Sequence, residues 1–366
     1  MFTRNDTKKI AVGNIFVGGG SPVSVQSMTN TPTADARATV AQIRALCAAG
    51  CDIVRVAVPD AAAAAALPEI VASSPVPVVA DVHFDYRLAL AAVDAGVAKI
   101  RINPGNIGSP ERVRTVAASA RAHGVPIRVG VNSGSLEKDI LEKYGRPCGE
   151  ALAESALRQV AMLEAMDFGD ICVSVKSSNV IETVTACRTI AGKCAYPQHV
   201  GLTEAGTVRR GTIKSGLALG ILLSEGIGDT IRVSLTGDPV EEVKAGCEIL
   251  TALGLGGKRR VEFVSCPTCG RTKIDLIGLA GAIESRLDEA EREGKITRHV
   301  KVAVMGCAVN GPGEASDADI GLAGGDGFAL LFRKGKISGR LSGSNDEMAD
   351  LFVSEVLSLC AGGDAG

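Results

Sequence analysis

Residues 76–103, VPVVADVHFDYRLALAAVDAGVAKIRIN, contain a complete strand–helix–strand unit. The β-branched run Val76–Val82 predicts a strand, Arg87–Ala95 predicts a helix that ends before Gly96, and Lys99–Asn103 predicts a second strand. Strands that alternate with helices in this way pair in parallel within one sheet. The unit therefore indicates an α/β protein.

The same unit recurs along the first part of the chain. The predicted strands are Val23–Gln26, Ile53–Val58, Val76–Val82, Lys99–Asn103, Ile127–Val131, Ile171–Lys176, His199–Thr203 and Ile231–Leu235. The predicted helices include Ala36–Ala49, Ala61–Ala72, Arg87–Ala95, Pro110–His123, Glu150–Ala165, Thr207–Leu223 and Val240–Leu253. Eight units in about 255 residues match a closed (β/α)₈ TIM barrel. A doubly wound sheet is the alternative, but it usually has fewer strands, and no G-x-G-x-x-G follows the first one.

The rest of the chain has a different pattern. Glycines and charges at 255–260 predict a linker, so we place a barrel domain at 1–254 and a small α/β domain at 261–366. The elements predicted there are a strand ending at Val264, a helix Lys273–Glu293, a strand Val300–Met305, a hairpin Ala329–Ile337 and a helix Asn345–Leu359.

Composition excludes several classes of protein. The 366 residues carry a net charge of −2 and no Trp, which argues against nucleic-acid binding. The longest charge-free stretch, Ile10–Ala34, is too polar to span a bilayer, and the N-terminus has no signal-peptide pattern. We therefore expect a cytoplasmic protein without membrane contact, in which the 11 cysteines stay reduced.

Cations stand within or at the ends of five predicted barrel strands. They are Arg55, Arg101, Arg128, Lys176 and Arg232. Ligand chemistry in a TIM barrel takes place at the carboxyl ends of the strands, and a cation inside a strand is costly unless an anion compensates it. These cations either pair with carboxylates on the loops or bind a polyanionic ligand. Five from five strands favour the ligand, and Arg favours phosphate or diphosphate.

Polar residues share strand faces with these cations. Period-two alternation places Asn103 with Arg101, Asn132 with Arg128, and Ser234 with Arg232, and it pairs Asp81 with His83. We count His83 among the binding residues, although a structural role fits it equally well. Glu204, in GLTEAG, is either a salt-bridge anchor or a general acid/base.

Three cysteines differ from the others. Cys266 and Cys269 form a C-x₂-C motif, and Cys307 also follows a strand of the small domain. A zinc site usually needs a fourth Cys or His, whereas three cysteines and an oxygen ligand suit an iron–sulfur cluster, with Glu314 as the oxygen candidate. Packing is the simpler interpretation of the other eight: Cys47, Cys51, Cys148, Cys172, Cys187, Cys194, Cys247 and Cys360.

Ten motifs in order carry a resemblance. They are SVQSMTNT (24–31), VRVAVP (54–59), ADVHFDYRL (80–88), IRINPGNIG (100–108), RVGVNSGSL (128–136), VSVKSSN (173–179), LTEAG (202–206), RVSLTGDP (232–239), CPTCGR (266–271) and VNGPGEA (309–315). With these motifs the chain resembles the bacterial two-domain 4-hydroxy-3-methylbut-2-en-1-yl diphosphate synthases of the methylerythritol phosphate route to isoprenoids.

The resemblance implies a cofactor and a reaction. The cofactor would be a [4Fe-4S] cluster on Cys266, Cys269, Cys307 and Glu314. The reaction would be a two-electron reductive ring opening and dehydration of 2-C-methyl-D-erythritol 2,4-cyclodiphosphate, with electrons from reduced flavodoxin or ferredoxin. Glu204 would donate the proton.

The resemblance also implies the binding residues and the assembly. Substrate contacts would be Arg55, Arg101, Asn103, Arg128, Asn132, Lys176, Arg232, Ser234 and Asn310. Members form homodimers in which the cluster domain of one subunit caps the barrel of the other. Two alternatives remain: a non-redox barrel enzyme acting on a phosphorylated ligand with a structural zinc domain, and an iron–sulfur sensor.

Overall fold

The computed structural model describes residues 3–256 and 260–361. They belong to two compact units, Met1–Gly257 and Lys258–Gly366. Part of the linker predicted at 255–260 lies outside the described residues, because 257–259 are not among them. The bounds of that linker stay a prediction.

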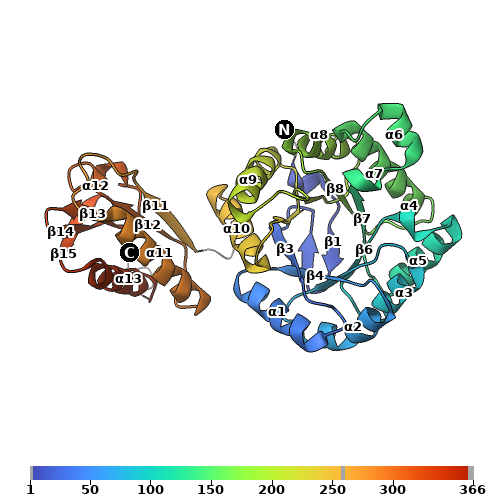
Figure 1. The fold of residues 1–366 in the computed structure, drawn as a ribbon, viewed down its shortest axis with the longest axis horizontal. Helices are drawn as coiled ribbons and strands as arrows, with labels where there is room; N and C mark the ends of the chain where they lie inside the picture. The colour runs from blue at the N-terminus through green and yellow to red at the C-terminus, as the bar shows by residue number, and fades with distance from the viewer. Residues whose placement is uncertain (1–2, 257–259, 362–366) are drawn as a thin grey trace. The chain divides into compact units, whose positions relative to one another are not determined.

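Eight parallel strands form the inner wall of the first unit, in the order β8-β7-β6-β5-β4-β3-β10-β9 (Figure 1). They are β3 (Ser24–Met28), β4 (Ile53–Ala57), β5 (Val78–Asp81), β6 (Lys99–Ile102), β7 (Ile127–Asn132), β8 (Ile171–Lys176), β9 (His199–Val200) and β10 (Thr230–Ile231). A parallel bridge between Val173 and Gln198 joins β8 to the chain entering β9 and closes the wall. The predicted TIM barrel is confirmed.

Helices surround these strands (Figure 1). They are α1 (Ala36–Ala48), α2 (Ala61–Ser73), α3 (Tyr86–Asp94), α5 (Pro110–Ala122), α7 (Gly149–Glu164), α8 (Val180–Ala191), α9 (Val208–Ser224) and α10 (Pro239–Ala252), with short α4 (Pro104–Ile107) and α6 (Lys138–Tyr144) in two loops. Side-chain caps define several starts. The carboxylates of Asp35, Asp60 and Asp238 each accept a backbone N–H of the first turn that has no partner within the helix.

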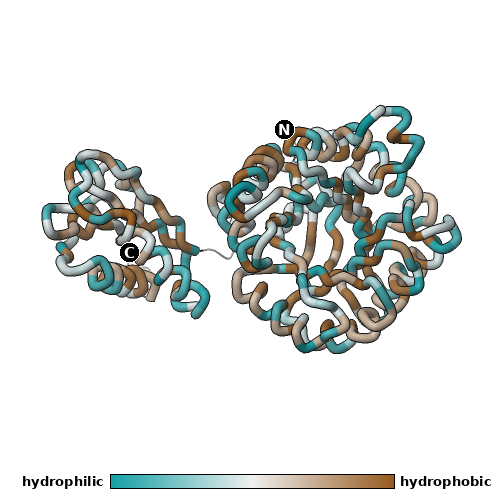
Figure 2. Tube along the Cα trace, viewed as in Figure 1, coloured by the Kyte–Doolittle hydropathy of each residue, from teal (hydrophilic) through white to brown (hydrophobic). Residues whose placement is uncertain are grey.

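The apolar core of this unit lies between the strands and the helices. Outward-facing residues of adjacent strands, such as Val54, Val56, Ile100 and Ile102, are fully buried there. Figure 2 shows hydrophobic residues along the strands and hydrophilic ones on the outer loops. Since helix packing already buries the outer strand faces, the inner faces are free to carry polar side chains.

A two-stranded hairpin, β1 (Ile10–Val12) and β2 (Ile15–Val17), was not expected from the sequence. Its buried side chains pack on Ile53, Val79 and Cys172, which lie near the amino ends of their strands. The hairpin therefore supplies an apolar floor at the amino end of the barrel.

Two strands end earlier than predicted. The sequence pattern extends to Thr203 and Leu235, whereas β9 ends at Val200 and β10 at Ile231. Gly201 explains the early end, because its φ is +150° and a Cβ there would lie 2.1 Å from the carbonyl oxygen of Arg232. The two backbones approach too closely here for any residue except glycine.

The second unit is a mixed sheet with helices. Its strands, in sheet order, are β11 (Val261–Ser265), β12 (Val300–Met305), β13 (Ile320–Gly325), β14 (Phe328–Arg333) and β15 (Lys336–Leu341). The first three are parallel and the last two pair antiparallel. Helices α11 (Leu276–Arg292) and α13 (Asn345–Ala361) pack with the sheet in one apolar core, and α12 (Gly311–Glu314) is short.

Strand β13 was missed by the sequence interpretation, and α11 begins three residues later than expected. The later start has a local cause, since the Asp275 carboxylate accepts the N–H of Gly278 and caps the helix. Among the described residues, no helix is long and apolar enough to cross a membrane.

Candidate functional site

Three of the predicted cations stand side by side on neighbouring strands. Arg55 is in register with Val79 on β5, two residues before Asp81, and Asp81 is in register with Arg101, which pairs in turn with Arg128. Arg101, Arg128 and Lys176 are buried, while Arg55 and Arg232 keep 12% and 16% of their side chains exposed. We call these five residues the cation ring.

Asp81 is the anionic centre of one side of the cation ring. Its carboxylate lies 3.0 Å from Arg101 Nη1, 3.6 Å from Arg55 Nε and 3.5 Å from His83 Nε2. Burial alone would raise the pKa of Asp81, but the charge of Arg55, the hydrogen bond of His83 and the charge of Arg101 together hold it well below its usual range. Asp81 is therefore ionised and orients these groups.

Gly130 makes room for Arg101. A Cβ at Gly130 would lie 2.4 Å from Arg101 Nε, and the guanidinium donates to the Gly130 carbonyl at 3.2 Å. The arginine can reach across the face of β7 only because this strand position is a glycine.

Arg128 and Lys176 have much weaker compensation. Arg128 donates to Gln26 Oε1 at 3.3 Å, and its Nε has no partner among the described side chains and backbone. Burial lowers the pKa of Arg128 to about 10, with a further contribution from Arg101. Burial, followed by the charge of Arg232, also lowers the pKa of Lys176. These buried charges leave an excess of positive potential at the barrel interior.

On the side of the cation ring away from Asp81, Arg232 is neutralised by the carboxylate of Glu242. Its Nη2 lies 3.3 Å from Glu242 Oε2, and Glu242 also accepts the N–H of Leu235 at 2.9 Å. Met28 lies between two cations, with its sulfur 2.8 Å from Arg55 Nη2 and 3.8 Å from Arg232 Nη1. Glu242, Met28 and Gln26 were not predicted, although the alternation on β3 could have identified the last two.

The neutral residues of the predicted site lie beside the ring. Asn103 is buried, its Oδ1 accepts the N–H of Gly105, and its Nδ2 has no partner in the described part of the chain. Asn132 ends β7, and its backbone N–H donates a hydrogen bond to Ser135 Oγ. Ser234 follows β10 and is partly exposed. Asn103 therefore offers a donor to a ligand.

Glu204 stands apart from the buried charges. It is exposed, in the loop after β9, and its backbone has φ +52°, a conformation that is uncommon for a residue other than glycine. Such conformations cluster at functional sites, where the fold holds them in place. The loop presents the carboxylate to solvent at the carboxyl end of the strands.

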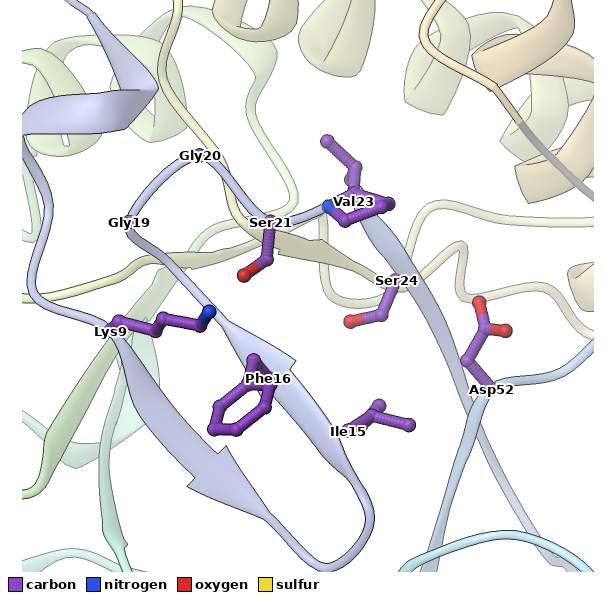
Figure 3. Close-up of a pocket in the computed structure, with 10 residues that line it drawn as sticks. Lys9, Ile15, Phe16, Gly19, Gly20, Ser21, Val23, Ser24 and Asp52 are labelled. Carbon is purple, nitrogen blue, oxygen red and sulfur yellow. The ribbon is translucent and has the colours of Figure 1, made fainter.

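A separate hollow lies at the amino end of the barrel. Figure 3 shows Lys9, Phe16, Ser21 and Ser24 around a cavity of about 440 Å³. The Lys9 ammonium lies 4.2 Å from the centre of the Phe16 ring, and Asp52 accepts the N–H of Val25. The charged groups here already have partners, and the end of the barrel is the wrong one for TIM-barrel chemistry.

The predicted cluster ligands of the second unit follow two adjacent parallel strands. Ser265 of β11 is in register with Val304 of β12, so the loops after both strands leave the same edge of the sheet. Cys266 Sγ accepts the N–H of Gly306 at 3.1 Å, which ties the first loop to the residue before Cys307. Cys269 is exposed.

Arg271 lies among the other predicted ligands. The thiol of Cys269 first, and then the charges of Cys307 and Glu314, raise the pKa of Arg271. Asn310 Nδ2 donates to Glu314 Oε1 at 3.4 Å, and both residues belong to the turn of α12. Within the described residues, however, no three Cys, His, Asp or Glu side chains are close enough to hold a single metal ion.

The remaining cysteines are of another kind. Six of these eight are buried, namely Cys51, Cys148, Cys172, Cys187, Cys247 and Cys360. Burial raises the pKa of Cys187 to about 12, which keeps its thiol protonated. The burial of these cysteines agrees with the predicted role in core packing.

Comparison with models of protein families shows to which family the chain belongs. A model of the GcpE TIM-barrel domain matches residues 7–247, and a model of the GcpE protein C-terminal domain matches residues 262–358. The chain belongs to the GcpE family. The resemblance inferred from the ten motifs is thereby confirmed.

This GcpE-family chain has similar relatives named 4-hydroxy-3-methylbut-2-en-1-yl diphosphate synthase (flavodoxin). The one from Clostridium acetobutylicum is 60% identical over 353 residues, which cover 96% of this chain and 99% of the relative. The one from Ruminiclostridium cellulolyticum is 59% identical over 342 residues, covering 93% and 95%. The GcpE barrel also resembles the solved 3-dehydroquinate dehydratase of Geobacillus kaustophilus, with a TM-score of 0.50 and 15% identity over 68% of this chain and 98% of that chain. That likeness concerns the fold alone.

Proposed function

We propose that this GcpE-family chain catalyses the two-electron reductive ring opening and dehydration of 2-C-methyl-D-erythritol 2,4-cyclodiphosphate to 4-hydroxy-3-methylbut-2-enyl diphosphate in isoprenoid biosynthesis. The cation ring carries the proposal, because its five cations surround the barrel interior and, among the described residues, pair only with the carboxylates of Asp81 and Glu242. The chain is 60% identical to a synthase of that name, over 96% of this chain and 99% of the relative, and this similarity supports the same substrate.

The cation ring would bind the diphosphate of the substrate. Arg128 and Lys176 are buried and form no ion pair among the described residues, so both would gain a counter-charge from the ligand. Asp81 holds Arg55 and Arg101 in place before the ligand arrives, so less side-chain entropy is lost on binding. Asn103, Asn132, His83 and Ser234 would add neutral contacts from neighbouring strand ends.

The second unit would hold a [4Fe-4S] cluster on Cys266, Cys269, Cys307 and Glu314. The donor set fits, since three thiols and one carboxylate come from two loops at one sheet edge that are joined by the Cys266–Gly306 hydrogen bond. A four-iron cluster binds each ligand through a different iron, so its ligands need not meet at one point. When bound, it would supply single electrons and Lewis acidity. Asn310, next to Glu314, would contact the substrate.

Glu204 would hold the proton that leaves with the substrate oxygen as water. Its loop stands at the carboxyl end of the strands, and its backbone has the uncommon positive φ that clusters at functional sites. The balance is two electrons and one proton in, with one C–O bond broken at the ring and one water released.

Two partners complete the proposal. Reduced flavodoxin, which the names of the relatives mention, or ferredoxin would deliver the electrons one at a time. A homodimer would bring the cluster domain of one subunit over the barrel of the other in the cytoplasm. The alternative, a non-redox enzyme with a structural zinc domain, has no support in the relatives' names.

The decisive experiment is turnover of the cyclic diphosphate by anaerobically purified protein, with dithionite and a viologen dye as reductant. We expect formation of the allylic diphosphate and about four irons and four acid-labile sulfides per chain. One zinc per chain without sulfide, or iron without turnover, would refute the proposal and would favour the zinc enzyme or the sensor, respectively.

A further inference from the structure

Lys99 is a charged residue in the barrel interior that the proposed reaction does not use. It begins β6, is 0% exposed, and stands opposite Val79 on β5. Its Nζ has no hydrogen-bond partner among residues 3–256 and 260–361. A buried ammonium in this condition costs the folded protein stability unless a ligand compensates it.

Among the described residues, none of the charged groups that act on Lys99 is a carboxylate. On its own strand Arg101 follows two residues later, and Arg128 and Arg55 face it from β7 and β4. Cys172 on β8 and His199 on β9 are the other titratable neighbours. Burial, despite the charges of Lys99 and Arg128, raises the pKa of Cys172, so this thiol stays neutral.

The remaining neighbours are neutral or engaged. Burial, followed by the charge of Arg128, lowers the pKa of His199, so this ring is neutral as well. Asp229, which lies near Cys172, accepts from Thr7 Oγ1 and from the N–H of Gln198. The β1–β2 hairpin below is apolar. Within residues 3–256, the cation ring is thus the positively charged region through which the Lys99 charge can act on an anion.

Resting on the proposed function, we infer that Lys99 is a sixth cation of the diphosphate site. It is a positioning residue that strengthens anion binding from beneath the cation ring. Its buried charge lowers the stability of the empty barrel. The electrostatic link is direct. Burial first, and then the charges of Arg128 and Arg55, lower the pKa of Lys99 to about 8. Because the Lys99 charge interacts with Arg128 and Arg55, it also attracts an anion that is bound between them.

The test compares Lys99→Met with the unaltered protein, using inorganic pyrophosphate as the probe in isothermal titration calorimetry at pH 7. Methionine preserves the volume and removes the charge. We expect pyrophosphate to bind at least about tenfold more weakly, because the variant removes the attraction between one buried charge and a multiply charged anion. The melting temperature of the empty variant should equal or exceed that of the unaltered protein.

A pH series separates charge from packing. The pKa of Lys99 is lower in the folded than in the unfolded chain, so its destabilising effect is complete below pH 8 and is relieved as the pH rises toward the unfolded value of about 10.4. The advantage in melting temperature of Lys99→Met should therefore shrink between pH 7 and pH 10. Lys214→Met, at an exposed position of α9, should change neither quantity.

The outcomes are distinct. Unchanged pyrophosphate affinity in Lys99→Met, or loss of the folded state in both Lys99→Met and Lys99→Gln, overturns the inference, because Lys99 is then structural. If the unaltered protein itself does not bind pyrophosphate, the diphosphate site of the proposed function fails together with it. Weaker binding at equal or higher stability establishes the role.

Discussion

Arg101 Nη1 and Asp81 Oδ1 lie 3.0 Å apart in the interior of the barrel, and both side chains are at most 7% exposed. The same carboxylate also lies beside Arg55 and His83. One anion therefore organises one side of a site that is otherwise strongly positive. Removal of that anion should affect stability as well as binding.

Asp81→Asn should lower the free energy of unfolding by about 3 kcal/mol at pH 7, because it leaves buried guanidinium groups uncompensated. The pKa of Asp81 is lower in the folded than in the unfolded chain, so its contribution is complete above pH 4 and is lost as the pH falls below that value. Urea unfolding at pH 7 and pH 3 measures both effects. Asp139→Asn, which breaks an exposed pair with Arg158 that solvent screens, should cost much less. Equal losses would contradict the central role of Asp81.

Glu204→Gln should reduce turnover by about 10²–10⁴-fold, because the amide cannot deliver the proton. Iron content, pyrophosphate affinity and the melting temperature should stay unchanged, since the carboxylate is exposed. Glu69→Gln, at an exposed position of α2, is the matched control. Turnover near the level of the unaltered enzyme would exclude Glu204 as the acid.

Cys307→Ser should lose most of the iron and acid-labile sulfide, because a serine oxygen is a poor substitute for a thiolate on a cluster iron. Cys247→Ser removes a buried thiol of α10, in the barrel unit and not in the unit of the ligand loops, and should keep the full iron content. Metal analysis and the visible absorption spectrum measure both variants. A colourless Cys247→Ser protein would mean that the cysteines have been assigned wrongly.

Gly201→Ala should destabilise the barrel by about 2 kcal/mol or more, because φ is +150° and the new Cβ would meet the Arg232 carbonyl at 2.1 Å. Gly216→Ala is the matched control, since nothing lies within 4 Å of a Cβ there and the residue is inside α9. That change should stabilise by about 0.5–1 kcal/mol. Urea midpoints of the two variants should therefore move in opposite directions.

Most of the barrel and the cation ring could be predicted because both depend on local rules. Period-two alternation inside apolar runs placed Arg101 with Asn103 and Arg128 with Asn132, and strand β8 was predicted with its observed bounds. The same rule places Lys99 on the face of Arg101, but a lysine at the first position of a strand looks like a solvent-exposed boundary. Its burial depends on the β1–β2 hairpin, whose packing on distant strands no local pattern specifies.

Other details depend on tertiary contacts. The early end of β9 follows from the approach of Arg232 to Gly201, and the two residues are 31 positions apart in the sequence. The pairing of Arg232 with Glu242 requires the first turn of α10 to fold back toward β10. Strand β13, rich in glycine, lacks the β-branched signal that identified the other strands, and its place between β12 and β14 is set by pairing.

In the described part of the chain, the β1–β2 hairpin covers the amino end of the barrel, so the carboxyl ends of the strands form the entrance to its interior. Substrate and product, both diphosphates, must then use the same passage and compete for the same cations. Each catalytic cycle ends only when the product has dissociated from the same cations that attracted the substrate. Product release, sensitive to ionic strength, thus becomes a natural limit on the rate, and free pyrophosphate a natural inhibitor.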